Sequence, residues 1–223
     1  MTTDGEVQYK DSNELIKSRG YERMGLMTSW AWLDDPKRLA FMFARYKFVS
    51  KILAGTNRVL EVGCGDGVGA RIVRQTVSSL TAIDFDNEFI KSALEIRSEK
   101  WPINFFVHNM LTSPFSGEFE GIYCLDVLEH IKKDEEGKFI INMITSLTPH
   151  GVVVIGMPSL SSQIYASAHS KIGHINCKDQ PELNALMKKY FHNVFMFSMN
   201  DEVVHTGYYA MSHYNITVCV SKK

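Results

Sequence analysis

The hydrophobic positions of the chain follow two periods, one typical of buried strands and one typical of amphipathic helices. Short apolar runs predict strands, and apolar residues that recur at three and four positions predict helices. The expected strands cover 59–62, 80–86, 103–107, 121–125, 152–157, 194–199 and 214–220. The expected helices cover 35–53, 68–75, 87–100, 134–147 and 181–191. A turn is expected at 148–151 and an irregular segment at 159–177.

Strands and helices alternate over the first 160 residues, which predicts a parallel sheet covered on both faces. No clear helix separates the last two strands, so they are expected to pair antiparallel at one edge. The predicted fold class is therefore α/β. It is a Rossmann-like, seven-stranded, mostly parallel sheet with helices on both faces and an antiparallel edge strand.

The N-terminal part differs from the rest in its pattern. Residues 1–34 are predicted to be an N-terminal extension, and 35–223 the main domain. The extension carries Tyr21, Met24, Trp30 and Trp32. These aromatic and apolar side chains form either a lid over a site or ordinary packing against the edge of the sheet, and the sequence leaves both open.

Composition narrows the class of partner. Of 223 residues, 24 are Lys or Arg and 25 are Asp or Glu, so the net charge is −1. This balance argues against a broad phosphate-backbone footprint, so no nucleic-acid partner is expected. The chain has no apolar run long enough to span a membrane and no signal-peptide core. Four scattered cysteines are typical of reduced thiols, and a cytoplasmic location is expected.

Three glycines end the first strand. Gly63, Gly65 and Gly67 follow the apolar run 58–62, and a helical pattern comes next. Glycine permits both a tight turn and a close approach of the backbone to a ligand. Strand, glycine turn and helix together predict a ligand at the carboxyl end of a parallel strand.

Two segments carry a family resemblance. Residues 61–67 (EVGCGDG) are similar to the acidic-x-G-x-G-x-G motif of class I S-adenosylmethionine-dependent methyltransferases. Residues 124–131 (CLDVLEHI) are similar to a motif of the small-molecule branch, which includes the ubiquinone-biosynthesis-type O-methyltransferases. The resemblance covers about 37–160 and implies S-adenosylmethionine as cofactor. A dinucleotide site is the alternative, but Asp66 in the turn would repel a phosphate.

The resemblance implies a set of cofactor-binding residues. Asp84 is expected to bind the ribose, although capping of the next helix is the alternative. Phe85 is expected to pack against the adenine, and Asn109 to contact its amino group. Arg45 is expected near the cofactor carboxylate, or else on the surface. The full set is Arg45, Glu61, Gly63, Gly65, Asp84, Phe85, Asn109, Met110, Leu125 and Asp126.

Histidines are the candidates for proton removal from an acceptor, because an imidazole titrates near neutral pH. His174 is the first candidate and His169 the second, both in the irregular segment. His130 is either a third candidate or a histidine satisfied by local backbone. His169, His174 and Cys177 fit no usual zinc spacing, so no metal is expected.

The predicted function is methyl transfer from S-adenosylmethionine to a hydroxyl of a small polar metabolite: a sugar, a glycan precursor or a quinol. The sequence leaves three alternatives open. These are an N-methyltransferase acting on a small amine, a nucleic-acid or protein methyltransferase, and a non-catalytic S-adenosylmethionine-binding protein. The expected partner is a small-molecule acceptor, and a homodimer is an assembly that the sequence allows.

Overall fold

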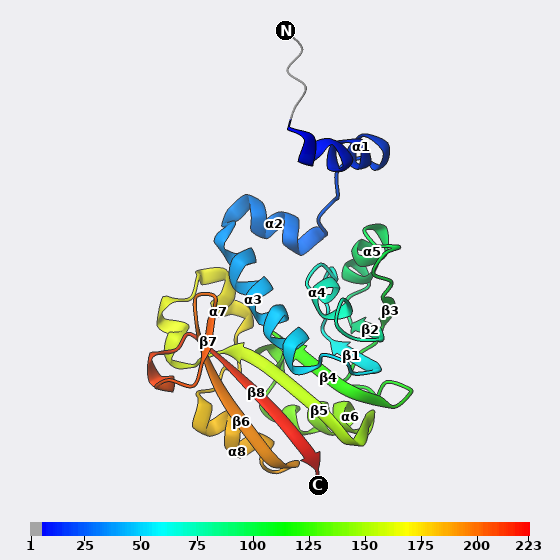
Figure 1. The fold of residues 1–223 in the computed structure, drawn as a ribbon. Helices are drawn as coiled ribbons and strands as arrows, with labels where there is room; N and C mark the ends of the chain where they lie inside the picture. The colour runs from blue at the N-terminus through cyan, green and yellow to red at the C-terminus, as the bar shows by residue number, and fades with distance from the viewer. Residues whose placement is uncertain (1–5) are drawn as a thin grey trace.

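Eight strands form one mixed sheet in the order β3-β2-β1-β4-β5-β8-β6-β7 in the computed structural model, which describes residues 6–223 (Figure 1). The first five strands pair parallel, and β8 runs antiparallel between β5 and β6. The strands are β1 Arg58–Val62, β2 Ser79–Asp84, β3 Asn104–Val107, β4 Phe119–Leu125, β5 Leu147–Pro158, β6 Phe191–Asn200, β7 Val203–His205 and β8 Tyr214–Lys222.

Helices precede the sheet and connect its strands. The α-helices are α1 Lys10–Arg19, α2 Leu26–Asp34, α3 Lys37–Ile52, α4 Ala70–Arg74, α5 Asn87–Glu95, α6 Glu136–Thr145, α7 Ala168–Gly173 and α8 Gln180–Met187. Four short 3₁₀ helices are η1 Val7–Tyr9, η2 Leu128–His130, η3 Ser161–Tyr165 and η4 Tyr209–Met211. In Figure 1, α1 stands apart from the sheet, and α2 lies above the end of α3.

The core has two layers because neighbouring strand residues point to opposite faces of the sheet. On one face, Val59 packs with side chains of α3 and α4. On the other face, Leu60 packs with side chains of α6 and α8. The predicted α/β sheet with helices on both faces and an antiparallel strand near one edge is confirmed.

The structure corrects four details. The sheet has eight strands and not seven, because β7 lies between the last two predicted strands, 194–199 and 214–220. Strand β7 has three residues, which are too few to show the alternation of apolar and polar side chains that predicts a strand. The helix predicted at 87–100 ends at Glu95, where the Arg71 guanidinium donates to the Ile96 carbonyl. In a longer helix this carbonyl would instead accept from the amide of residue 100.

The predicted turn at 148–151 belongs to β5. Phe119 of β4 pairs with Leu147, whereas Gly121 pairs with Val152, so the register shifts between the two pairs. Such a bulge absorbs extra residues without ending the strand. The segment 159–177 is also less irregular than expected, because it contains η3 and α7.

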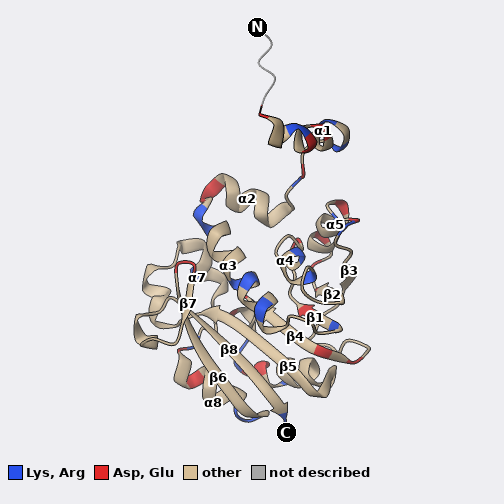
Figure 2. Cartoon of the chain, viewed as in Figure 1, with Lys and Arg blue, Asp and Glu red and all other residues tan. Residues whose placement is uncertain are grey.

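The charged residues of α3 are all basic, whereas α1 carries both signs (Figure 2). Figure 2 shows basic and acidic stretches mixed on α1, and the strands β5, β6 and β8 are mostly uncharged. In the described part of the chain, no helix combines the length and apolar character needed to cross a bilayer. The expected absence of a nucleic-acid partner and the expected cytoplasmic location stay predictions.

Candidate active site

The glycine turn, residues 63–67, lies at the carboxyl end of β1. The amides of Gly63 and Cys64 both donate to the Ile83 carbonyl of β2, at 2.8 and 3.0 Å. Gly63 has φ +79°, and a Cβ there would lie 2.2 Å from Cγ2 of Val127. The turn therefore needs glycine at this position both for its backbone conformation and for its packing.

Gly65 is tied to the end of the next strand. Its amide donates to one carboxylate oxygen of Asp84 at 2.9 Å, and the other oxygen accepts from the Asp86 amide at 2.9 Å. Burial raises the pKa of Asp84, and these two backbone hydrogen bonds oppose the rise. Gly65 has φ +52°, and a Cβ there would have no atom within 4 Å. The open side of the turn is thus at Gly65.

Two adjoining cavities open beside this turn. The smaller cavity has about 200 Å³, and the larger cavity has about 550 Å³. Gly63, Asp84, Phe85, Val127 and His130 line both of them. The walls of the larger cavity come from α2, α3, the glycine turn, the ends of β2 and β4, and α7.

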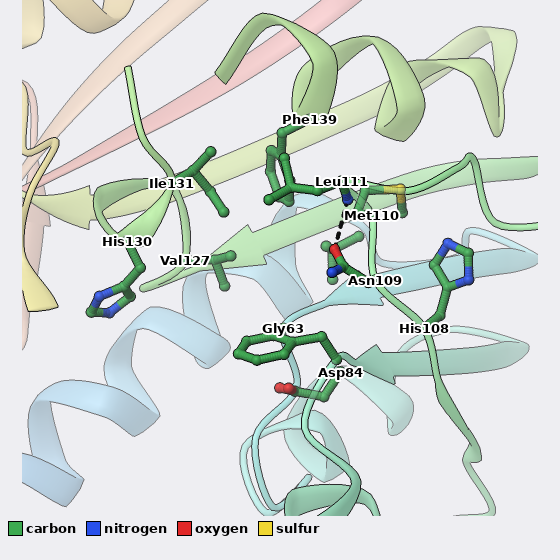
Figure 3. A pocket seen from close by; sticks show the side chains of 12 residues that line it. Gly63, Asp84, His108, Asn109, Met110, Leu111, Val127, His130, Ile131 and Phe139 are labelled. Atoms are coloured by element: carbon green, nitrogen blue, oxygen red, sulfur yellow. Dashed lines mark hydrogen bonds between the residues drawn. The ribbon is translucent and has the colours of Figure 1, made fainter. Parts of the chain in front are cut away.

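The smaller cavity is mostly apolar. Figure 3 shows Val127, Ile131 and Phe139 around it, with Asp84 below and Met110 and Leu111 beside it. Asn109 also lines it, and its amide oxygen accepts from the Leu111 amide at 2.8 Å. Its amide nitrogen keeps both hydrogens available. Phe85 is 73% exposed, so its ring has a free face beside Asp84.

Arg45 and Asp126 form an ion pair in the wall of the larger cavity. Nη1 of Arg45 lies 2.9 and 2.7 Å from the two oxygens of Asp126. The guanidinium also stacks on Tyr214, 3.8 Å from the ring centroid. Nε of Arg45 is buried and has no hydrogen-bond partner in the described chain. Asp126 directly follows β4 and has φ +56°, a strained value for a residue other than glycine. Leu125 also lines this wall.

Glu61 lies beneath the turn and lines neither cavity. It is 1% exposed, and its Oε1 accepts from the Tyr46 hydroxyl at 2.7 Å. Burial raises the pKa of Glu61 to about 8. Its Oε2 and the hydroxyl of the neighbouring Tyr123 have no hydrogen-bond partner within the described residues. The Tyr123 hydroxyl can donate to either form of Glu61, so burial of the charge is what favours the protonated carboxyl.

This environment predicts a pH-dependent stability. The folded-state pKa of Glu61 is about 8, above its ordinary value of 4.5. Its stabilising contribution is therefore complete below pH 4.5 and is lost as pH rises toward 8. We expect Glu61→Gln to remove this slope, because the glutamine amide stays neutral at every pH. The loss for the wild type is on the order of a few kcal/mol, at about 1.4 kcal/mol per pKa unit.

Urea unfolding of both proteins at a series of pH values measures the difference. Other titrating groups are common to the two chains, so the difference isolates Glu61. Parallel curves for the wild type and Glu61→Gln would contradict the prediction.

The three candidate histidines all reach the larger cavity. His130 and His174 lie together, with ring centroids 5.3 Å apart, whereas His169 stacks near Trp30 at 5.7 Å. The pKa of His174 is lowered, first by burial and then by the nearby His130. His174 is therefore neutral at pH 7 and has a basic ring nitrogen.

Comparison with known proteins agrees with this geometry. Residues 32–192 match the sequence profile of the family described as "Methyltransferase domain". The chain belongs to this methyltransferase family. The match covers more than two thirds of the methyltransferase chain, including α3, the glycine turn and the smaller cavity. The residues of α2 that line the larger cavity precede the match.

Similar proteins include the ubiquinone biosynthesis O-methyltransferases of Rickettsia bellii (strain OSU 85-389) and Psychrobacter arcticus. The first is 26% identical over 132 residues, covering 59% of this methyltransferase and 54% of the relative. The second is 21% identical over 147 residues, covering 61% and 54%. The chain thus spans about half the length of the curated relatives that it matches.

A similar solved structure is the N-methyltransferase NodS from Bradyrhizobium japonicum WM9 in complex with S-adenosyl-L-homocysteine. Its TM-score is 0.65 at 17% identity, with 94% of this methyltransferase and 97% of NodS covered. This likeness concerns the fold. The predicted class I fold and S-adenosylmethionine as cofactor are confirmed. The roles of single residues stay predictions.

Sequence reasoning missed two features of the methyltransferase site. One is the contact between α2 and the glycine turn, where Asp66 accepts from the amide and the hydroxyl of Thr28 at 2.7 and 2.9 Å. No sequence signal indicates a contact between residues so far apart. The other is Glu129, which lies in the wall of the larger cavity. Its place directly before His130, inside the motif 124–131, was the available signal.

Proposed function

We propose that this chain transfers a methyl group from S-adenosylmethionine to a hydroxyl of a small polar metabolite, such as a sugar, a glycan precursor or a quinol. The main support is the meeting of two cavities at Gly63, Asp84 and His130. One cavity has the apolar character that suits a purine, and the other has a basic imidazole. The glycine turn lies between them.

The residues present fit the cofactor. The open space over Gly65 accommodates a ligand lying directly on the backbone. The smaller cavity would hold the adenine, with Phe85 against its face and the Asn109 amide at its polar edge. Met110 adds an apolar wall. Asp84 would accept from the ribose hydroxyls, since each of its oxygens keeps a free lone pair.

Arg45 and Asp126 suit the amino-acid end of the cofactor. Only Nη1 of Arg45 donates to Asp126 in the described chain, so the guanidinium keeps further N–H donors for a carboxylate. Asp126 and Leu125 would complete that wall, and Asp126 brings a negative charge toward the cationic part of the ligand. Glu61 would contribute indirectly, because its carboxyl accepts a hydrogen bond from Tyr46 and fixes the position of that ring in the wall of the larger cavity.

The larger cavity has room for a small acceptor. At about 550 Å³ it falls within the usual size of ligand pockets, and part of the cofactor occupies it as well. Its wall combines the Trp30 and Phe41 rings with the hydroxyls of Ser167 and Ser170. Aromatic surface beside hydroxyls suits a ring that carries several oxygens.

The chemistry then depends on alignment and proton removal. When bound, S-adenosylmethionine supplies a sulfonium methyl group that is already activated for in-line displacement. The chain would hold the acceptor oxygen in line with the methyl carbon and the sulfur. In ideal cases such alignment alone lowers the activation barrier by about 7 kcal/mol. His174 would accept the hydroxyl proton, with His169 and His130 as the other candidates.

The extension, residues 1–34, is proposed to act as a lid through α2. Met27, Trp30 and Ala31 of α2 line the larger cavity. The bonds from Thr28 to Asp66 tie the helix to the glycine turn. A Cβ on Gly25 would lie 2.4 Å from Cβ of Asp66, so the chain passes close to the turn. A closed α2 would exclude water from methyl transfer. Residues 1–5 lie outside the described part of the chain.

Calorimetry tests the cofactor assignment. We expect S-adenosylmethionine and S-adenosylhomocysteine to bind and NAD not to bind. Asp84→Asn should weaken S-adenosylhomocysteine binding by at least about fivefold, or ~1 kcal/mol, the value of a lost charged hydrogen bond. Asp86→Asn is the matched control, because Asp86 caps α5 and asparagine caps equally well. Equal affinity of the two variants would remove Asp84 from the site.

Product analysis tests the acceptor class. The purified chain is incubated with labelled S-adenosylmethionine and separate pools of sugars, quinols and small amines. Label in a hydroxyl of a sugar or quinol supports the proposal, whereas label on amines only would indicate an N-methyltransferase. Tight cofactor binding with no labelled product from any pool would indicate a non-catalytic binding protein.

A further inference from the structure

The carboxylate of Glu129 is buried without a hydrogen-bond partner. The residue is fully buried, and in the described structure neither carboxylate oxygen has a partner. Arg45, the positively charged side chain that acts on Glu129, is paired with Asp126. A buried carboxylate without hydrogen bonds or a cation is costly, so its environment is incomplete as it stands.

Two histidine rings lie beside this carboxylate. Nε2 of His130 is 4.0 Å from Oε1 of Glu129. One donor atom from each of Glu129, His130 and His174 can be chosen so that all lie within 4.8 Å of one another. Ligands bound to one ion at ~2.1 Å are roughly 3–4 Å apart, so small side-chain rotations bring the three atoms together.

The outer hydrogen bonds hold both rings with one nitrogen free. Nδ1 of His130 lies 2.8 Å from the Gly173 carbonyl, which can only accept. Nδ1 of His174 lies 2.8 Å from Oε1 of Gln163, whose amide nitrogen donates to the Ser159 carbonyl. Both Nδ1 atoms therefore carry the hydrogen, and both Nε2 atoms keep a lone pair. This arrangement is the usual second shell of histidines that bind metals.

The backbone also joins the two segments that carry these residues. The Glu129 carbonyl accepts from the amides of Ile175 and Asn176, at 3.0 and 2.9 Å. The residue next to His174 is thereby fixed to η2, although the two segments are far apart in the sequence. A rigid support of this kind positions ligands within the tolerance that a metal requires.

We propose that Glu129, His130 and His174 form a binding site for a divalent transition-metal ion in the wall of the larger cavity. Two imidazole nitrogens and one carboxylate suit zinc, iron, cobalt or manganese, and they leave coordination positions open toward the cavity. The sequence-based expectation of no metal rested on the spacing of His169, His174 and Cys177. The cluster described here uses only His174 of these three.

The role of the ion rests on the proposed function. An ion here would bind the acceptor through its oxygen and lower the pKa of the acceptor hydroxyl. The proton would pass to solvent, and the oxygen–carbon bond would form as the carbon–sulfur bond of the cofactor breaks. In that case His174 acts as a ligand and not as the proton acceptor. Acceptors with adjacent hydroxyl or carbonyl oxygens would bind best, because they can occupy two open positions.

Metal titration of the chelator-treated chain, without cofactor or acceptor, tests the site. Calorimetry with Zn²⁺ should give one tight site per chain, and Co²⁺ should give the absorption bands of a bound ion. Mg²⁺, which prefers oxygen ligands, should bind more weakly. Glu129→Gln, His130→Ala and His174→Ala should each lower Zn²⁺ affinity at least tenfold. His169→Ala is the matched control, because His169 lines the same cavity outside the cluster.

Several outcomes decide between the explanations. Equal Zn²⁺ affinity of the wild type and His174→Ala, or no Co²⁺ bands in the wild type, would overturn the site and favour a neutral, protonated Glu129. Thermal unfolding of each variant identifies any that fails to fold, and the Co²⁺ spectrum of the wild type needs no variant. S-adenosylhomocysteine binding in the same preparations keeps the two proposals separate. Cofactor binding without metal refutes only the metal site, and metal binding without cofactor refutes only the proposed function.

Discussion

Gly65→Ala should strongly weaken cofactor binding and leave the protein folded. The new Cβ would have no atom within 4 Å, so it creates no clash inside the chain. It would occupy the open space over the turn, where the proposed ligand approaches the backbone most closely. We expect the affinity for S-adenosylhomocysteine to fall by at least ~30-fold, or about 2 kcal/mol. The free energy of unfolding should fall by about 1–2 kcal/mol, because alanine is strained at φ +52°.

Gly63→Ala provides the contrast. Its Cβ would lie 2.2 Å from Cγ2 of Val127, so this variant should lose stability through overpacking, by ~1–3 kcal/mol beyond the backbone strain. Adding Val127→Ala should restore that part of the stability, because it removes the clashing methyl groups. The pair separates a glycine needed for packing from a glycine needed for a ligand.

Urea unfolding and calorimetry with S-adenosylhomocysteine measure both effects on the same preparations. Wild-type affinity in Gly65→Ala would mean that the ligand does not lie on the turn. The proposed placement of the cofactor would then be wrong, whatever the stability of the variant.

The elements that could be predicted from the sequence are those with a local signal. The apolar run 58–62 and the glycines after it predicted β1 and the turn. Periodicity predicted α3, and the lack of a helix between the last two predicted strands predicted their antiparallel pairing. Periodicity fails where an element is short, as in β7, or where a tertiary contact ends a helix, as Arg71 does at Ile96. In both places the deciding interaction lies outside the local window.

The site follows the same division. Asp84 and Gly65 lie at the carboxyl ends of two adjacent parallel strands, and parallel topology brings such ends together. The sequence could therefore predict that the two residues lie close to each other. The bonds from Thr28 to Asp66 and the approach of Glu129 to His174 join segments with no shared pattern. The sequence-based expectation of no metal rested only on the spacing of His169, His174 and Cys177. Sequence distance alone therefore did not identify the group that lies together in the fold. The chain folds His130 and Glu129 against His174 instead.

His174→Ala should reduce turnover by at least ~10²-fold, the usual contribution of a general acid or base. S-adenosylhomocysteine affinity should change little, because the His174 ring is hydrogen-bonded to Gln163 and not to any residue proposed to bind the cofactor. His150→Ala is the control, since His150 is exposed on β5 and lines neither cavity. Turnover within about twofold of the wild type would exclude His174 from the reaction.

The pH profile of the wild type should agree with this role. Burial and the nearby His130 lower the pKa of His174 below its ordinary value of 6.5, so its neutral form predominates at pH 7. Turnover should therefore be constant near neutral pH and fall only as pH drops below 6.5, through the lowered pKa. An acid limb centred above 6.5 would contradict this assignment.

The two possible roles of His174 predict different rescue of the alanine variant. If His174 is the base, higher pH should restore turnover, because the acceptor hydroxyl then ionises without it. If His174 is a metal ligand, a high concentration of Zn²⁺ or Mn²⁺ should restore turnover at constant pH, because Glu129 and His130 still hold the ion weakly. Steady-state rates over a grid of pH and metal concentration distinguish these results. The two roles make opposite predictions for the same variant, since a nitrogen that binds an ion has no lone pair left for a proton.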